Sequence, residues 1–522
     1  MTVRRMMGIE TEYGVLEPGF PMANPMALSA AVVAGYAQSV ATARWDYEGE
    51  DPLADARGFR LDRAAAHPDQ LTDSPADLAA RLGPYHRRRP GPEERPGPMT
   101  SLVLTNGARL YVDHAHPEYS SPEVTGPRAA VLWDRAGEEV MRRAAAALAA
   151  EPAMPDVALY KNNVDGKGQS YGTHENYLMD RAVPFGDVVR YLTPFLVTRQ
   201  VFTGSGRVGL GPRSEVPGFQ LSQRADYVEN DVGLETTFNR PIINTRDEPH
   251  ADAERYRRLH VIVGDANLLE TATYLKLATT SLVLWLLEQD AVPLALDTVA
   301  LDDAVAETRL VSHDTALTHR LTLADGRQMT ALEIQRLYLD TIREALGPDV
   351  DAETRDVLAR WDSVLTRLGE DPMSCAADVE WVAKLRVLEA MRRRDGLGWE
   401  HPRLAALDLQ WSDVRPERSI YQRLAASGAV ERLVTQEDVD AAVHAPPPDT
   451  RAWFRGETVR RYGAGVAAAG WESVVLDVPG TEHLVRLPMV EPGRGTRAQV
   501  GEALDASPDV ATLLEELRRR HG

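Results

Sequence analysis

The sequence predicts an α+β protein whose sheet carries polar, metal-binding side chains on one face. Strand patterns occur at residues 8–13, 106–118 and 257–263, helical patterns dominate 268–394, and two further strand patterns follow three consecutive prolines at 446–448. The first two strand patterns are the most informative, because they place acidic side chains where an ordinary strand would bury apolar ones.

In the first of these strands, Glu10 and Glu12 lie on one face, because side chains alternate along a strand. In the second, Tyr111 and Asp113 share a face, and Glu118 follows. Carboxylates held side by side repel each other unless a cation or a proton lies between them. An exposed edge strand would explain the first segment alone, but Glu118 favours a divalent-metal cluster on a sheet face.

The remaining elements are predicted from periodicity and turn residues. Helices are predicted at 25–43, 128–150, 188–202 and 509–520, and paired strands at 471–478 and 483–490 around a Pro479-Gly480 turn. The most apolar segment, 271–287, contains Lys276 and ends at Glu288, so we expect a buried helix and not a membrane span.

One boundary divides the chain into two domains. We expect a catalytic domain over residues 1–440 and a small C-terminal α/β domain over 446–522. Within the first, residues 62–98 form a Pro- and Arg-rich insertion whose final prolines exclude a helix or a central strand. Because this insertion directly precedes the strand with Tyr111 and Asp113, we interpret it as a mobile loop near the active site.

Composition narrows the class of protein. The 522 residues are 43% hydrophobic, enough for a large core. The net charge of -20 argues against nucleic-acid binding, which needs a basic surface. Cys375 is the only cysteine, so no internal disulfide can form. Because the N-terminus runs into the acidic strand without an apolar stretch, we expect no secretory signal and no membrane association, and a cytoplasmic location.

Two motif matches are rejected. The glycines of residues 204–209 satisfy a dinucleotide-binding pattern, but Gly211 and Pro212 follow where a helix should begin, so we predict a glycine-rich turn. His114 and His116 would share a strand face and suggest zinc, yet the surrounding oxygen donors favour magnesium or manganese.

Two histidines have polar neighbours at strand spacing. His174 shares a face with Asn176 if that segment is extended, and His260 shares one with Arg258. An arginine beside a candidate metal ligand suits the binding of a phosphate group. The residues alone therefore predict a carboxylate-rich metal enzyme that acts on a nucleotide.

Longer motifs then make a family resemblance visible. They lie at residues 8–14, 106–113, 116–119, 171–177, 242–252, 258–265 and 450–456. Together they resemble the Pup ligase/Pup deamidase family, which is related to glutamine synthetase. The resemblance implies a carboxylate-amine ligase fold with a curved, mainly antiparallel sheet backed by helices, and ATP and Mg²⁺ bound on its concave face.

Several features resemble the deamidase branch of this family. They are the insertion after residue 60, residues 24–48, the spacing from Asp113 to Glu118, and residues 409–414, whereas Ile9 is closer to the ligase branch. The resemblance implies hydrolysis of the C-terminal Gln side-chain amide of the small protein Pup, and cleavage of Pup from lysines of pupylated proteins. The rival hypotheses are a Pup-protein ligase acting through a γ-glutamyl phosphate and a Pup-binding adaptor without activity.

Site residues are carried over position by position. The resemblance implies magnesium-site residues Glu10, Glu12, Tyr111, Glu118, His174 and His260; ATP contacts Arg109, Ser121, Asn176, Arg258 and Trp471; a catalytic Asp113; and an active-site Arg224. Asp113 would act as a nucleophile or as a base for water, and attack by inorganic phosphate from the nucleotide is a third route. ATP would be required but not consumed stoichiometrically.

Overall fold

The computed structural model describes residues 2–64, 66, 86–88, 100–151, 154–289 and 292–521. Most of the insertion predicted as a mobile loop over 62–98 lies outside these residues. Its short strand β6 (His86–Arg88) is described by its backbone.

The centre of the fold is a seven-stranded sheet in which every neighbouring pair is antiparallel. Its order is β16 (Tyr256–Val261), β11 (Thr173–Asp180), β1 (Met7–Glu12), β9 (His116–Ser120), β8 (Arg109–Asp113), β7 (Ser101–Leu104) and β3 (Thr42–Arg44). Along β1, Met7, Ile9 and Thr11 are buried against the helices, so Glu10 projects from the opposite face. The predicted α+β architecture is confirmed.

The strand predicted over 106–118 is a hairpin, and the prediction that His114 and His116 share a strand face is wrong. His114 has a left-handed backbone with φ of 50° and lies in the turn between β8 and β9. The chain reverses there, so Asp113 pairs with His116 across the hairpin. Periodicity could not show this reversal, because the turn lacks the glycine that usually marks one.

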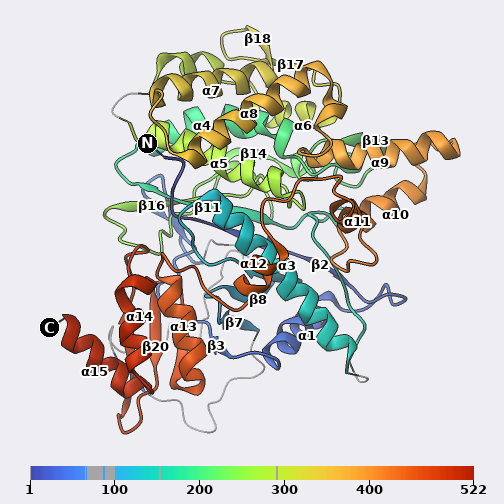
Figure 1. Ribbon diagram of the computed structural model, residues 1–522. Helices are drawn as coiled ribbons and strands as arrows, with labels where there is room; N and C mark the ends of the chain where they lie inside the picture. The colour runs from blue at the N-terminus through green and yellow to red at the C-terminus, as the bar shows by residue number, and fades with distance from the viewer. Residues whose placement is uncertain are drawn as a thin grey trace.

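Helices pack on one face of the sheet (Figure 1). They are α1 (Pro25–Ala37), α3 (Pro127–Ala149), α4 (Phe185–Thr203) and α5 (Glu270–Leu287). The helix predicted over 25–43 ends early, because residues 42–44 pair with β7 as an edge strand. The apolar helix α5 is buried, and none of the helices in the described part is long and apolar enough to cross a membrane.

Smaller elements surround this core. The other helices are α6 (Ala304–His313), α7 (Ala331–Leu346), α8 (Ala352–Glu370), α9 (Glu380–Asp395), α10 (Pro402–Trp411), α11 (Ile420–Ala426) and α12 (Gln436–Ala442). Two-stranded sheets pair β2 (Gly14–Leu16) with β10 (Ala158–Tyr160), β4 (Ala54–Asp55) with β5 (Phe59–Arg60), β12 (Arg207–Leu210) with β13 (Val216–Gln220), β14 (Asn230–Gly233) with β15 (Pro241–Asn244), and β17 (Arg320–Thr322) with β18 (Gln328–Thr330). The last hairpin interrupts the predicted helical region. The glycine-rich turn predicted over residues 204–209 is confirmed at 204–206, where α4 ends, but residues 207–209 lie in strand β12.

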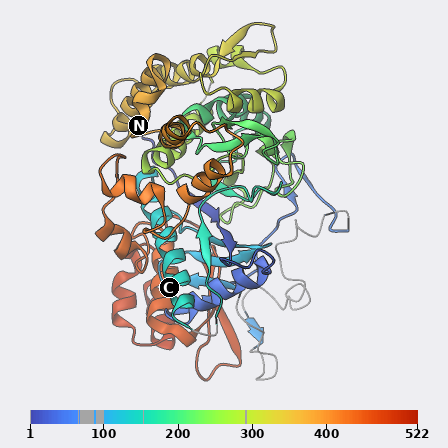
Figure 2. The same cartoon turned by 90° about the vertical axis from the view of Figure 1, so that its right-hand side faces the viewer.

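The C-terminal part lies at the opposite end of the molecule from α7 and α8 (Figures 1 and 2). It contains α13 (Ala452–Tyr462), α14 (Arg497–Ala506), α15 (Val510–His521) and a sheet in the order β19 (Val466–Ala469), β20 (Ser473–Leu476), β21 (His483–Pro488) and β6. The predicted strand pair around Pro479-Gly480 is confirmed. Its apolar core includes Ala43, Trp45 and Val103 from the first part, so the division at residues 440–446 stays a prediction.

A buried ion-pair network joins the two parts. Glu123, which follows β9, accepts hydrogen bonds from Arg451 at 2.7 Å and from Arg455 at 2.5 Å. Arg455 is fully buried and also donates to the carbonyls of Gly107 and Trp471. Burial alone would raise the pKa of Glu123, but the two arginines lower it to about 2. This network fixes the segment that carries Trp471 against the central sheet.

We expect Arg455→Met to lower the free energy of unfolding by about 3 kcal/mol, because it removes one partner of a buried ion pair. Chemical denaturation measures the change. The control is Arg460→Met on the same helix, whose side chain is 48% exposed and which should cost less than about 1 kcal/mol. Equal effects of the two substitutions would contradict a joining role for Arg455.

Candidate active site

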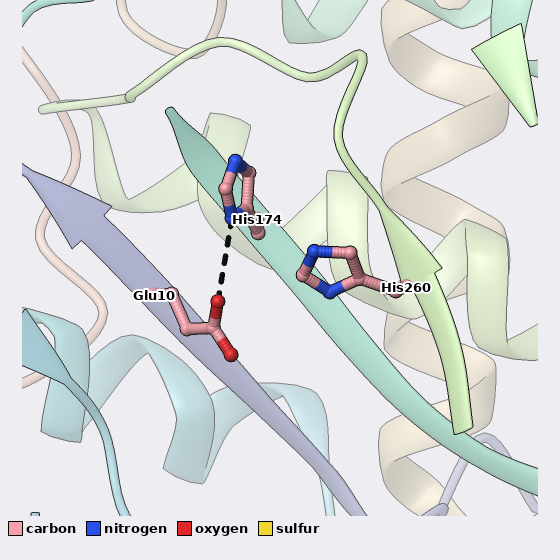
Figure 3. Close-up of side chains that lie close together, drawn as sticks. All are labelled: Glu10, His174 and His260. Atoms are coloured by element: carbon pink, nitrogen blue, oxygen red, sulfur yellow. Dashed lines mark hydrogen bonds and ion pairs between the residues drawn. The ribbon is translucent and has the colours of Figure 1, made fainter. Parts of the chain in front are cut away.

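Three neighbouring strands bring together one glutamate and two histidines. Glu10 on β1, His174 on β11 and His260 on β16 point toward one another (Figure 3). One possible ligand atom from each lies within 4.8 Å of the others, and His174 Nδ1 is 3.3 Å from a Glu10 carboxylate oxygen. The antiparallel register causes this arrangement, because Glu10 pairs directly with His174. This set is the histidine group.

A second group contains only carboxylates. Glu12, Asp113 and Glu118 come from β1, β8 and β9, and their oxygens likewise lie within 4.8 Å of one another. Glu12 pairs with Glu118 in the register, which places their side chains next to each other. Gly172 closes one side, since its N–H donates to Glu12 at 2.6 Å and an added Cβ would lie 2.2 Å from His174. This set is the carboxylate group.

The two groups differ in electrostatic balance. Burial would raise the pKa of Glu10, but a hydrogen bond from His174 and the charges of His260, His174 and Arg258 lower it below its ordinary value. In contrast, burial and the nearby Asp113, Glu12 and Glu10 raise the pKa of Glu118 well above its ordinary value. The charged form of Glu118 is therefore disfavoured, although His116 lies 2.9 Å from Glu12 and His114 lies 3.0 Å from Asp113.

The donor atoms of both groups fit a divalent cation. Carboxylate oxygens are the ligands that magnesium and manganese prefer in proteins, whereas the imidazole nitrogens of the histidine group suit transition metals. Glu118 is 1% exposed, and one of its oxygens has no hydrogen-bond partner among the described residues. Tyr111 adds a further oxygen beside this set, and burial and the charges of Glu118 and Glu10 raise its pKa well above its ordinary value.

A polar cavity of about 340 Å³ lies over both groups, and we call it the first cavity. Its wall includes Glu10, Arg109, Tyr111, Asp113, Glu118, His174, Arg258, His260 and Trp471. An adjoining space of about 90 Å³ adds Ser121 and Asn176, and Ser121 is fixed there by accepting a hydrogen bond from the Ile9 N–H at 3.0 Å.

Asn176 connects the histidine group to the guanidinium group of Arg258. Its amide nitrogen donates to Glu10 at 2.9 Å, and its oxygen accepts from Arg258 at 2.5 Å and from His260 at 2.9 Å. The shared strand faces predicted for His174 with Asn176 and for His260 with Arg258 account for these contacts. Arg258 thus places a positive charge at the wall of the first cavity, where a phosphate group could bind.

Arg109 and Trp471 form an aromatic corner of the first cavity. The Arg109 guanidinium lies 4.1 Å from the Trp45 ring centre and 4.0 Å from that of Tyr111. Trp471 packs edge-on against Trp45 at 5.0 Å. Trp471 follows β19, so the C-terminal part completes the cavity from a position distant in sequence.

A second cavity of about 780 Å³ lies on the other side of the carboxylate group. Its wall includes Glu12, His116, Tyr171, Arg224 and Arg240, and it shares Asp113 and His174 with the first cavity. Every predicted site residue therefore lines one of three adjoining cavities. Asp113 lies between the two larger cavities. Burial alone would raise the pKa of Asp113, but a hydrogen bond from His114 and the charge of that histidine lower it below the ordinary value.

Sequence reasoning missed several polar residues of the cavities, of which His250 and Arg240 are examples. His250 lies in the first cavity with φ of 46°, and burial and the charges of Arg258 and Arg451 lower its pKa well below the ordinary value. Arg240 lies in the second cavity. Both belong to irregular segments between strands, where side-chain alternation gives no placement. The family motif at 242–252 contains His250 and was the only feature of the sequence that pointed to this residue.

The fold and site together define a glutamine synthetase-like carboxylate-amine ligase fold, in which an antiparallel sheet presents carboxylates and histidines to a polar cavity. Solved structures agree. The structure of the complex between Pup and its ligase PafA matches with a TM-score of 0.76 at 30% identity, covering 96% of this chain and 92% of that one. The structure of PafA in complex with ADP matches with a TM-score of 0.70 at 33% identity, covering 86% and 96%.

The chain belongs to the Pup-ligase protein family, whose model matches residues 5–475. The depupylase of Acidothermus cellulolyticus is 53% identical, with 99% of both chains covered. The Pup deamidase/depupylase of Mycolicibacterium smegmatis is 52% identical, covering 99% of this chain and 100% of that protein. The Pup--protein ligase of Acidimicrobium ferrooxidans is 43% identical over 70% of this chain and 80% of its own. The predicted family is confirmed.

The raised pKa of Glu118 leads to a prediction for the stability of the protein. A carboxyl group with a raised pKa in the folded state stabilises the fold fully only below its unfolded pKa of about 4.3, and this stability is lost as pH rises through the raised value. We therefore expect Glu118→Gln to raise the melting temperature of the metal-free protein at neutral pH. Added Mg²⁺ at 100 times its dissociation constant should stabilise the wild type by about 2.7 kcal/mol, and the variant much less.

Thermal melts with and without Mg²⁺ measure both effects. Asp302→Asn, which removes an exposed carboxylate outside the cavities, serves as the control and should keep the wild-type response to Mg²⁺. A Glu118→Gln variant that is less stable without metal and equally stabilised by Mg²⁺ would contradict this electrostatic account.

Proposed function

We propose that this protein is a hydrolase of the Pup pathway. It removes the side-chain amide of the C-terminal Gln of Pup, giving Glu, and cleaves the isopeptide bond between Pup and lysines of pupylated proteins. The observation that carries this function is the identity of 52–53% to a depupylase and a Pup deamidase/depupylase over 99% of this chain. The ligase relative matches at lower identity over 70% of the chain.

The first cavity suits a nucleotide. Arg258 provides positive charge for phosphate, and Arg109, Trp471, Ser121 and Asn176 offer stacking and polar contacts in adjoining spaces. The family neighbour PafA was solved in complex with ADP, which supports ATP as the cofactor here. Glu10, Glu12, Tyr111, Glu118, His174 and His260 would hold Mg²⁺, which when bound would polarise the reacting carbonyl and stabilise negative charge on it. We further propose a cytoplasmic location.

The second cavity suits the reacting end of Pup. Asp113 lies at the boundary of both cavities, so its carboxylate reaches a substrate amide on one side and the metal-binding residues on the other. Its lowered pKa keeps it ionised at neutral pH. It can then attack the amide carbon as a nucleophile or take a proton from water. Arg224 adds positive charge to the wall where negative groups of the substrate lie.

We expect Asp113→Asn to reduce both deamidation and depupylation by at least about 1,000-fold, because it removes the nucleophile or base. Mass spectrometry follows deamidation as a gain of about one dalton at the C-terminal Gln of Pup. Nucleotide binding should persist, since the nucleotide contacts remain. Activity of Asp113→Asn within about tenfold of the wild type would contradict a catalytic role for Asp113.

The direction of the reaction separates hydrolase from ligase. Amide hydrolysis in water is downhill, so depupylation should proceed with ADP or a slowly hydrolysed ATP analogue in addition to ATP, at rates that can differ. Formation of an isopeptide bond is uphill and must consume one ATP for each bond. Conjugation of Glu-ended Pup to protein lysines, with one ADP released for each conjugate, would instead establish the ligase reaction.

A further inference from the structure

The carboxylate of Asp265 joins segments of the chain that are distant in sequence. Asp265 follows β16, is 3% exposed and lines none of the three cavities. Its Oδ2 accepts hydrogen bonds from the Ser205 N–H at 2.9 Å, the Ser205 hydroxyl at 3.2 Å and the Gln223 N–H at 2.9 Å. Its Oδ1 accepts from the Ser222 hydroxyl at 2.8 Å and the Arg224 N–H at 3.2 Å. Five donors therefore converge on one buried carboxylate.

The donors to Asp265 belong to irregular backbone. Residues 204–206 and 222–224 lie outside helices and strands, so their buried N–H groups need acceptors from elsewhere in the chain. Among the residues that the structure describes, no Lys, Arg or His nitrogen lies within 4.0 Å of the Asp265 carboxylate. This carboxylate therefore serves to hold backbone, and it does not form an ion pair.

The backbone that Asp265 holds carries Arg224 into the second cavity. Arg224 is 3% exposed, and its Nη1 donates to the Tyr171 carbonyl. Gln223 is linked to the same carbonyl. Its side-chain oxygen accepts from the Asn163 N–H at 2.8 Å, and the Asn163 side chain donates to the Tyr171 carbonyl at 3.1 Å. Asp265 thus fixes the Arg224 backbone and, through Gln223, the acceptor that orients the Arg224 side chain.

Asp265 is itself held by the core of the protein. Lys276 on α5 is 1% exposed and donates from Nζ to the Asp265 carbonyl at 2.7 Å and to the Asn267 side chain at 2.9 Å. A short segment of the same chain joins Asp265 to His260 on β16. One buried residue therefore connects the strand of the histidine group to the wall of the second cavity.

We propose that Asp265 is a positioning residue that acts through Arg224. It holds the backbone of Arg224, fixes the guanidinium group in the second cavity and touches neither substrate nor nucleotide. The inference rests on the proposed function, because it makes the placement of this positive charge necessary for hydrolysis. Asparagine cannot replace Asp265, because donors approach both carboxylate oxygens and the NH₂ group would face at least two of them.

A double-mutant cycle tests the coupling between the two residues. Ammonia release from Pup ending in Gln measures kcat/KM. We expect Asp265→Asn to lower kcat/KM by about 30-fold in the wild type, but by less than about threefold in Arg224→Gln, because the side chain that it positions is then absent. The dissociation constant of ADP should change by less than about threefold in Asp265→Asn, since Arg224 lies outside the first cavity.

Hydrogen exchange measured by mass spectrometry tests the geometry without reference to activity. In Asp265→Asn, the amides of Gln223 and Arg224 lose their acceptor, so peptides that contain them should exchange at least about tenfold faster. Ser222→Ala removes one donor to Asp265 and serves as a milder variant if Asp265→Asn does not fold. It should lower kcat/KM by about fivefold, again only where Arg224 is present.

Glu270→Gln is the matched control. Glu270 is 1% exposed, and its carboxylate also accepts hydrogen bonds from two backbone N–H groups, those of Leu433 and Val434, but it lines none of the three cavities. It should lower the melting temperature and keep kcat/KM within about threefold of the wild type.

An equal loss of kcat/KM with and without Arg224, or unchanged exchange at Gln223 and Arg224, would overturn the proposal while the hydrolase function stands. A loss of kcat/KM in Glu270→Gln as large as in Asp265→Asn would also overturn it, because destabilisation alone would then account for the effect. Absence of ammonia release by the wild type would contradict the proposed function. Hydrogen exchange would then still decide whether Asp265 holds the backbone of Arg224.

Discussion

The mutual repulsion of Glu12, Asp113 and Glu118 is the constraint on which the site depends. Three strands hold these carboxylates within 4.8 Å of one another, and burial together with the nearby acids raises the pKa of Glu118. This repulsion destabilises the folded state, so other interactions must offset it. The buried core of helices on the opposite face of the sheet contributes that stability. A divalent cation relieves the repulsion, which couples the stability of the sheet to the occupation of the site.

Charge balance separates the tasks of the two large cavities. On the side of the first cavity, Asn176 and Arg258 compensate Glu10, so the histidine group is organised by the protein alone. On the other side, Arg224 and Arg240 line the second cavity together with Glu12, whose charge acts on both. The first side suits a nucleotide and its metal ions, and the second suits an anionic substrate. Asp113 lies where the two meet.

Much of this arrangement follows from local sequence. Alternation along the strands placed Glu10 with Glu12 and His174 with Asn176 correctly, and the family motifs predicted the antiparallel sheet, which the structure confirms. The hairpin at His114 escaped prediction, because its turn depends on a left-handed residue other than glycine. His250 and Arg240 escaped because irregular segments have no periodicity. Their positions depend on contacts between segments distant in sequence, which a local pattern cannot express.

Diffraction with Mn²⁺ in place of Mg²⁺ tests the central claim most directly. Crystals of the protein grown with ADP and Mn²⁺ would show each bound cation as an anomalous peak. The account predicts Mn²⁺ bound by Glu12 and Glu118 next to Asp113, and a further peak at the histidine group. Anomalous peaks confined to other parts of the protein, with both groups free of metal at saturating Mn²⁺, would contradict it.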